Sequence, residues 1–350
     1  MPRELILTAP RTLELREYEE SPLKPSQVRV RSILTAEKHG TTLAEYRGVT
    51  AFHNRRYDPK LGLFLKLKPG EKPSARYPAR VGNMTVGVVV EVGEGVSRFK
   101  VGDRVYGYLP VRETHTVEES YEYIWHAPPE LSDEELVCID PAVVALMGVR
   151  EGHVRLGDTV AVFGLGAIGL MTVQMARLSG SLKVIAVEPI GLRRKLAERY
   201  GADHVINPRT CDPGLEVKKL TNGRGVDVSI DTSGSYRALH QAIRCTAYGG
   251  KVVPVSWYHG DALGLDLGEE WHFNRYVMVS GARVESEPYR DHPRWYRARV
   301  YETVVELFRR RMLRVDGMLN PIVPLEEAVE AYRLIDEHPE QTVKLAIKYG

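Results

Sequence analysis

Apolar and polar positions follow two different rhythms along the chain. Over roughly the first 130 residues, short Val-rich runs are separated by Gly and Pro, as at 28–32, 87–93 and 102–106. Short apolar runs bounded by turn residues are typical of β-strands. The sequence therefore predicts a β-rich, barrel-like lobe at its N-terminal end.

From Asp158 onward, Val-rich runs alternate with helical patterns. The runs lie at 159–163, 184–187, 226–231 and 251–255. Continuous apolar runs of this length are typical of parallel strands buried on both faces, and their alternation with helices indicates βαβ units. We therefore expect a doubly wound α/β sheet here.

The last segment changes character again after Ser280. Helical patterns cover 301–311 and 325–337, and an apolar run at 343–347 predicts a closing strand that rejoins the first lobe. A chain of 350 residues is long for one hydrophobic core. Two domains are the expectation.

A glycine-rich loop joins the run at 159–163 to a helical pattern at 170–178. It reads Gly164-Leu165-Gly166-Ala167-Ile168-Gly169. In a strand–loop–helix context, the first glycine makes the tight turn, the second admits the pyrophosphate, and the third allows close packing of helix on strand. Phosphates then meet free N–H groups at the helix N-terminus. The pattern predicts a dinucleotide site.

Glu188 stands nineteen positions past Gly169, at the end of the next predicted strand. An acid there accepts hydrogen bonds from the adenosine ribose and repels a 2′-phosphate, which favours NAD over NADP. Arg193 and Arg194 follow closely and keep NADP as the alternative. The remaining candidate cofactor-binding residues follow neighbouring predicted strands: Arg193, Thr232, Gly234, Val255 and Ser256.

Composition and charge exclude several other classes of protein. The formal net charge is only +2, which argues against nucleic acid or a membrane as the main partner. There is no apolar run of the roughly 20 residues that a membrane helix needs, and the N-terminus lacks a signal-peptide pattern. Three scattered cysteines offer neither a disulfide framework nor a structural zinc knot. We expect a cytoplasmic enzyme that acts on a small molecule.

Three stretches carry a family resemblance: Gly87–Val96, Phe99–Val105 and Leu131–Glu135. With the glycine loop, they make the chain similar over nearly its full length to the medium-chain dehydrogenase/reductase superfamily, in its zinc alcohol and polyol dehydrogenase group. The resemblance implies a GroES-like catalytic domain at 1–141 and 284–350, and a Rossmann NAD-binding domain at 142–283.

The same resemblance implies an active site in the cleft between the two domains. It also implies a homodimer or homotetramer that pairs through the edge strand expected at Tyr276–Ser280.

The zinc-ligand stretches depart from the family pattern. His39-Gly40-Thr41-Thr42 replaces Cys-Gly-Thr-Asp, and Gly82-Asn83-Met84 replaces Gly-His-Glu. A catalytic zinc needs three protein ligands, so we expect no metal. The chain more closely resembles a zinc-lacking branch related to bacteriochlorophyllide hydroxyethyl dehydrogenases. The stretches that carry this likeness are 41–48, Gly249-Gly250, Trp257–Gly260, Arg294-Trp295 and 343–349.

Without zinc, a proton-transfer group and hydrogen-bond donors must stabilise the charge that develops on the alcohol oxygen. The candidates are His39, Lys38, Thr41, Asn83 and Asp140. His39 is the proposed acid/base, Thr41 matches a relay hydroxyl, and Asp140 matches a position that orients the site. Structural interpretations remain open for each: a hydrogen-bonded core histidine, a solvated lysine, or a capping aspartate.

The sequence thus predicts a zinc-independent, NAD-dependent oxidoreductase for a secondary alcohol on a polyol, sugar or cyclic substrate. Two alternatives remain: a zinc-free NADPH enone or quinone reductase, and a catalytically silent dinucleotide-binding protein. Arginines and aromatic residues at 53–57 and 289–297 suit an anionic or polyhydroxylated substrate, but they equally suit a solvated surface.

Overall fold

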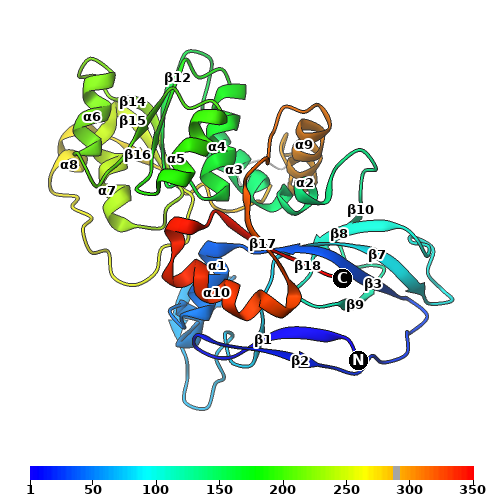
Figure 1. The fold of residues 1–350 in the computed structure, drawn as a ribbon. Coiled ribbons are helices and arrows are strands. Elements are labelled where there is room, and N and C mark those ends of the chain that lie inside the picture. Colours follow the sequence, from blue (N-terminus) through cyan, green and yellow to red (C-terminus); the bar gives the residue numbers. More distant parts are fainter. Residues whose placement is uncertain (287–291) are drawn as a thin grey trace. The chain divides into compact units, whose positions relative to one another are not determined.

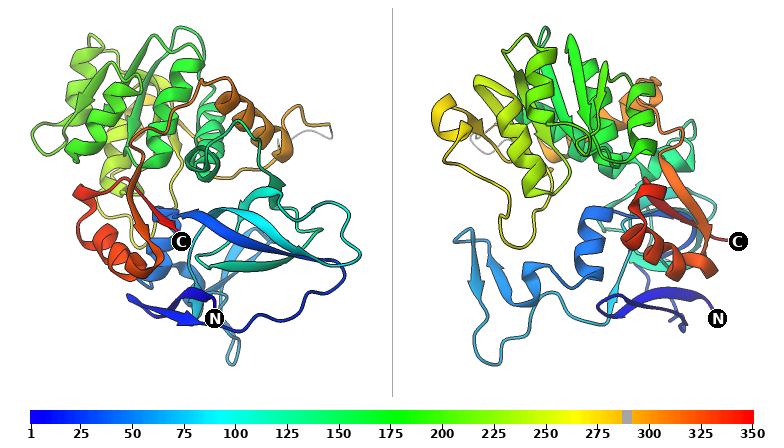
Figure 2. Two further views of the ribbon diagram at one scale, coloured as in Figure 1. Left: turned by 45° about the vertical axis from the view of Figure 1, so that its right-hand side comes forward. Right: turned by 60° about the vertical axis from the view of Figure 1, so that its left-hand side comes forward.

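Two units divide the chain in the computed structural model, which describes residues 1–286 and 292–350 (Figures 1 and 2). Unit 1 comprises Met1–Val137 and Leu319–Gly350, and unit 2 comprises Cys138–Met318. Part of the expected arginine-rich segment, Tyr289 to Asp291, lies outside the described residues.

The boundaries differ from the expected 141/142 and 283/284, the second by the larger amount. Helix α9 (Arg297–Arg309) packs against α3 (Ile139–Glu151). It buries Val300, Val304 and Phe308, so the segment before Leu319 belongs with unit 2.

The main sheet of unit 1 runs in the order β10-β8-β7-β3-β18-β17, with β9 also pairing with β3. Strands β3 and β7 are antiparallel, and the C-terminal strand β18 pairs antiparallel with β3. Val28, Val30, Val89 and Val105 form the core of this sheet. The strands are β3 (Gln27–Ala36), β7 (Met84–Val92), β8 (Arg104–Tyr108), β9 (Thr114–Glu118), β10 (Ile124–His126), β17 (Leu319–Pro324) and β18 (Lys344–Lys348).

A second core in unit 1 lies between short strands and two helices. Leu5, Leu7, Tyr46, Tyr332 and Leu345 are among its buried members. The elements are β1 (Arg3–Ala9), β2 (Thr12–Glu17), β6 (Ala79–Arg80), α1 (His39–Tyr46) and α10 (Ala328–Glu337). The remaining elements of unit 1 are η1 (Ala51–His53), β4 (Arg55–Asp58), β5 (Leu63–Lys66), α2 (Asp133–Val137), η2 (Leu325–Glu327) and η3 (Pro339–Gln341).

Unit 2 is a six-stranded parallel sheet in the order β13-β12-β11-β14-β15-β16, with helices on both faces (Figure 2). The order reverses between β11 and β14, which is the switch point of a doubly wound sheet. The four Val-rich runs form β11 (Thr159–Phe163), β12 (Lys183–Val187), β14 (Val226–Asp231) and β15 (Thr246–Pro254). The predicted combination of a GroES-like lobe and a Rossmann sheet is confirmed.

The helices of unit 2 connect these strands. They are α3, α4 (Ala167–Leu178), α5 (Gly191–Arg199), α6 (Pro213–Leu220), α7 (Tyr236–Cys245), α8 (Glu270–Asn274) and α9. Strands β13 (His204–Ile206) and β16 (Val277–Met278) form the two edges of the sheet. Within the described residues, every helix is too short or too polar to cross a lipid bilayer.

Candidate active site

The glycine loop connects β11 to α4, and its first glycine is required by the backbone. Gly164 has φ +78°, and a Cβ there would lie 2.7 Å from the Ser233 Cα. Its N–H donates to the Val187 carbonyl, 2.9 Å away. The turn is therefore held between β12 and the segment that follows β14.

Gly169 sets how closely α4 packs against the sheet. A Cβ at this position would lie 1.9 Å from the Gly164 carbonyl oxygen and 2.8 Å from the Thr232 hydroxyl oxygen. That hydroxyl donates to the same carbonyl at 2.7 Å. Even one methyl group here would push the helix away from the strand.

Gly166 is different, because apart from its two neighbours in the chain none of the described residues lies within 4 Å of where its Cβ would be. It caps the N-terminus of α4, where Ala167 and Ile168 begin the helix. The open space beside Gly166 is on the side where phosphates bind to free helix N–H groups. The fold itself therefore does not require glycine at this position.

Glu188 is buried directly after β12, with 3 % of its surface exposed. Its Oε2 accepts the Leu165 N–H at 2.7 Å, and its Oε1 accepts the Ile190 N–H at 3.0 Å. Burial lowers the pKa of Arg193, and the carboxylate of Glu188 counteracts this. The acid is thus tied to the glycine loop itself.

Thr232, Gly234, Val255 and Ser256 lie where β14 and β15 end. The Val255 N–H donates to the Asp231 carbonyl at 2.8 Å, which joins the two strand ends. The structure therefore brings the predicted cofactor residues to the carboxyl edge of one sheet, on both sides of the switch point.

Asp231 and Tyr258 were not anticipated from the sequence. Asp231 is fully buried at the end of β14, and burial raises its pKa to about 6. The Tyr258 hydroxyl donates to its Oδ2, and the Ser233 N–H donates to its Oδ1 at 3.0 Å. The available signal was an acid at the end of a strand in which apolar and polar residues alternate.

In unit 1, His39 begins α1 beside the C-terminal strand. Its Nε2 accepts the Leu345 N–H at 2.9 Å, and the Glu37 N–H donates to the Leu345 carbonyl at 2.9 Å. The imidazole therefore extends the pairing of β3 with β18. Because Nε2 is an acceptor, the neutral ring carries its proton on Nδ1.

Lys38 is the N-cap residue of α1, and Thr41 lies in its first turn. Ala36 is paired with Met84 in the β3–β7 ladder, so Asn83 lies beside the chain that leads into His39. The buried Asn83 Nδ2 has no hydrogen-bond partner among the described residues. An amide donor of this kind is suited to a ligand oxygen. Asp140 lies in α3 and therefore belongs to unit 2.

The residues at the family's zinc positions do not fit a catalytic zinc. His39 uses Nε2 for strand pairing, and Asn83 offers an amide. Met84 is fully buried within β7. A tetrahedral site needs three N, S or carboxylate ligands, and this stretch of unit 1 does not supply them.

A buried acid lies beneath this stretch and was also missed. Desolvation raises the pKa of Glu37, and the hydroxyls of Tyr332 and Thr42 and the ammonium of Lys344 counteract this. The Lys344 ammonium also donates to the Glu37 carbonyl. The signal available in the sequence was a carboxylate directly after the strand that becomes β3.

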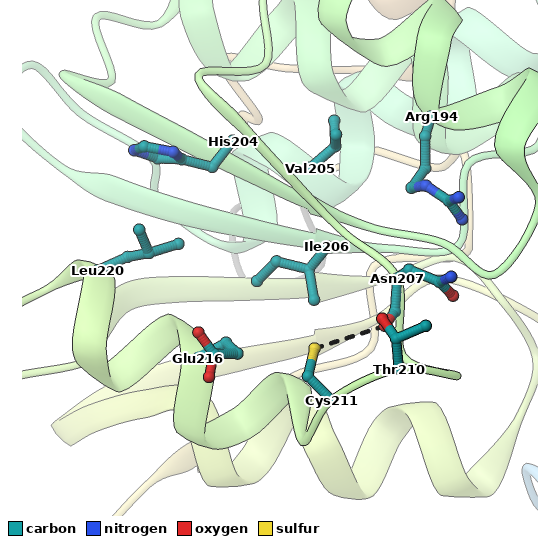
Figure 3. A pocket seen from close by; sticks show the side chains of 9 residues that line it. All are labelled: Arg194, His204, Val205, Ile206, Asn207, Thr210, Cys211, Glu216 and Leu220. Carbon is teal, nitrogen blue, oxygen red and sulfur yellow. Dashed lines mark hydrogen bonds between the residues drawn. The ribbon is translucent and has the colours of Figure 1, made fainter.

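A cavity of about 470 Å³ lies along the edge strand β13, between it and α6 (Figure 3). Arg194 lines it and also donates to the Glu188 carbonyl at 2.6 Å. Cys211 lies at its other side, with Sγ 3.4 Å from the Asn207 carbonyl. None of its lining residues belongs to the glycine loop.

His240, Glu269 and Glu270 lie close enough together to be considered as metal ligands. However, the His240 Nδ1 accepts the Asp266 N–H at 3.4 Å, so its Nε2 bears the proton. Arg244 pairs with Glu270 at 2.9 Å. The group is better described as an ion-pair network than as a metal site.

Comparison with known proteins identifies the family. Residues 60–125 match the alcohol dehydrogenase GroES-like domain, and residues 167–293 match the zinc-binding dehydrogenase family. D-guloside 3-dehydrogenase of Escherichia coli K12 is 38 % identical over 99 % of this chain and 100 % of its own. The chain belongs to the zinc-type alcohol and polyol dehydrogenases of the medium-chain dehydrogenase/reductase superfamily. The predicted superfamily is thereby confirmed, and the protein is an alcohol–ketone oxidoreductase of this type.

Solved structures of medium-chain dehydrogenases share the fold. That of 2R,3R-butanediol dehydrogenase from Bacillus subtilis is 25 % identical, with a TM-score of 0.76 and 99 % of both chains covered. The structure described as a zinc-binding dehydrogenase from Sinorhizobium meliloti 1021, bound to NADP, has a TM-score of 0.76. It is 20 % identical to this chain, and 99 % of both chains are covered. The second likeness shows the fold alone.

Proposed function

We propose that this medium-chain dehydrogenase uses NAD, without zinc, to interconvert a secondary alcohol of a sugar or polyol and its ketone. The observation that supports NAD is the buried Glu188 carboxylate, bonded to the glycine loop. Each of its oxygens retains acceptor capacity for a ribose hydroxyl, and its charge repels a 2′-phosphate. The proposal includes that the chain belongs to the zinc-lacking branch related to bacteriochlorophyllide hydroxyethyl dehydrogenases.

The cofactor would be held along the carboxyl edge of unit 2. Gly166 and the N-terminus of α4 would receive the pyrophosphate, and Glu188 with Arg193 would bind the adenosine ribose. The nicotinamide half would lie by the ends of β14 and β15, at Thr232, Gly234, Val255 and Ser256. When bound, NAD supplies the carbon that accepts or returns the hydride.

The residues of unit 1 would manage the oxygen and its proton. His39 would donate from Nδ1 to the developing oxyanion, because Nε2 is already an acceptor. The Asn83 amide would be a second donor to that oxygen. Thr41 would relay the hydroxyl proton to water, releasing its own proton as it accepts that of the substrate, and the Lys38 ammonium would be a further donor to the oxygen. His39 would then act as a hydrogen-bond donor rather than as the acid/base.

We infer a sugar substrate from the similarity to D-guloside 3-dehydrogenase of Escherichia coli K12. Its name specifies dehydrogenation at position 3 of a D-guloside, and it is 38 % identical along essentially the whole chain. The test measures NAD- and NADP-linked oxidation of methyl D-guloside and of (R,R)-2,3-butanediol by the purified protein.

NAD should bind at least tenfold more tightly than NADP, corresponding to about 1.4 kcal/mol, by calorimetry. Glu188→Gln should narrow that preference, because it removes the repulsive charge. Elemental analysis should find well under one zinc per chain, and chelators should leave activity unchanged. Equal affinities, one tightly held zinc per chain, or reduction of enones with NADPH in place of alcohol oxidation would each contradict the proposal.

A further inference from the structure

Two aromatic rings stand together on the loop that follows β15. The centroids of Trp257 and His259 are 4.6 Å apart, with an interplanar angle of 51°. Trp257 retains 38 % exposure. The loop therefore presents an accessible indole supported by an imidazole.

Tyr258, between them in sequence, fixes the loop to the sheet. Its hydroxyl donates to the buried Asp231 at the end of the neighbouring strand β14. Its ring also lies 5.1 Å from the ring of Tyr236 in α7. A loop anchored at both β14 and α7 holds Trp257 and His259 in place before any ligand arrives.

His259 carries an unmet hydrogen-bonding atom. Its Nε2 is buried and has no partner among residues 1–286 and 292–350. Leaving a buried polar atom without a hydrogen-bond partner is unfavourable, so a ligand group that supplies one is favoured here. Burial lowers the pKa of His259, so the ring is neutral near pH 7 and Nε2 is available to donate or accept.

The position of the loop is defined by the sheet. Glu188 directly follows β12, on the half of the sheet that binds adenosine in a doubly wound fold, so β14 and β15 border the other half of the dinucleotide. The loop after β15 therefore lies on the side where the hydride is exchanged.

We propose that Trp257 and His259 bind the sugar ring of the substrate: the indole covers the C–H face of a pyranose, and the His259 Nε2 hydrogen-bonds one of its hydroxyls. An aromatic face combined with a few placed polar groups is the usual composition of a small-ligand site. This inference rests on the proposed dehydrogenase function. It distinguishes ring substrates from short diols, which have no face for the indole to cover.

The test compares Trp257→Ala and His259→Ala with the control variant Tyr248→Ala. Tyr248 is an aromatic residue that is 66 % exposed and lies near the amino end of β15, the strand that precedes the loop. Trp257→Ala should raise KM for methyl D-guloside about tenfold or more and change KM for (R,R)-2,3-butanediol less than threefold. His259→Ala should show the same selectivity, with partial recovery in His259→Gln. Tyr248→Ala should match the wild type, and NADH affinity should be unchanged in all four variants.

Equal losses with both substrates, or no loss with the guloside, would overturn the inference while leaving the dehydrogenase function intact. If the wild type oxidises only the butanediol, the sugar platform is likewise excluded. If it oxidises neither substrate, the proposed function fails. Calorimetry of methyl D-guloside with the NADH complex then decides the inference separately: tenfold weaker binding by Trp257→Ala supports it, and no binding by the wild type rejects it.

Discussion

The glycine loop of unit 2 and the His39 stretch of unit 1 were both singled out from sequence, but different physics fixes them. At Gly164 and Gly169 the backbone leaves no room for a Cβ, so the residue type is dictated by geometry. At His39, the side chain accepts the Leu345 N–H, and the catalytic role that we propose for it is a second, separate function. A backbone constraint indicates a structural requirement for the residue type, whereas a polar side chain can serve structure, chemistry or both.

The largest effect is expected from Gly169→Ala, which tests whether the backbone of the glycine loop requires glycine at this position. The added methyl would overlap the Gly164 carbonyl oxygen at 1.9 Å, so α4 must shift away from β11. We expect NADH affinity to fall at least a hundredfold, together with a loss of thermal stability. Fluorescence titration and thermal denaturation measure the two effects.

Gly166→Ala is the matched variant, because apart from its two neighbours in the chain its Cβ meets none of the described residues within 4 Å. It should keep the wild-type melting temperature and lose about tenfold or more in NADH affinity, since only the ligand occupies that space. If Gly166→Ala bound NADH normally, the pyrophosphate would not lie beside Gly166. If Gly169→Ala were as stable as the wild type, the close packing would be wrong.

His39→Ala tests the chemical and structural roles of the His39 side chain. The substitution removes a donor to the oxyanion, so hydride transfer should slow by about a hundredfold while NAD affinity stays nearly constant. Single-turnover kinetics measures the rate. It also removes the acceptor of the Leu345 N–H, so some stability should be lost as well.

His39→Gln separates these two roles, because its amide can accept from Leu345 and still donate. It should restore stability and part of the rate. Full recovery of both in His39→Gln, with the loss in His39→Ala tracking stability alone, would make His39 purely structural. A large loss in Lys38→Ala with none in His39→Ala would transfer the chemical role to Lys38.

Much of the fold was predictable because periodicity reports burial directly. The four Val-rich runs became β11, β12, β14 and β15 with ends shifted by five residues or fewer. The boundary at 283/284 could not be read in this way. The apolar stripe of α9 specifies that it packs, but not on which unit.

The residues of the candidate site likewise fall into those that the local sequence predicted and those that depend on tertiary contacts. The glycine loop and Glu188 follow from local spacing, and the structure brings them together through the Leu165 N–H. The pairing of Asp231 with Tyr258, 27 residues apart, depends on which strands become neighbours. So does the burial of Glu37 against Tyr332 and Lys344, which come from the far end of the chain.

Buried titratable groups extend the comparison of the two units to stability. In unit 1, desolvation, with the charges of Arg112 and Arg80, lowers the pKa of His115 from 6.5 to about 3. The unfolded chain then binds a proton that the native state does not, so stability is lost as pH falls from about 6.5 to 3. The slope is up to about 1.4 kcal/mol per pH unit. Chemical denaturation of His115→Gln should show this slope removed relative to the wild type; an unchanged slope would contradict the burial of a neutral His115.

In unit 2, Asp231 should act with the opposite sign and over a narrower range. Its pKa is raised from 3.8 to about 6, so the native state holds the extra proton and stability is lost as pH rises through that window. Asp231→Asn should abolish this loss when its unfolding free energy is compared with that of the wild type between pH 4 and 7. The Tyr258 hydroxyl favours the charged carboxylate, so Tyr258→Phe should move the window to higher pH. No shift, or a shift to lower pH, would mean that the hydroxyl does not donate to Asp231, and the loop carrying Trp257 and His259 would lose its anchor at β14.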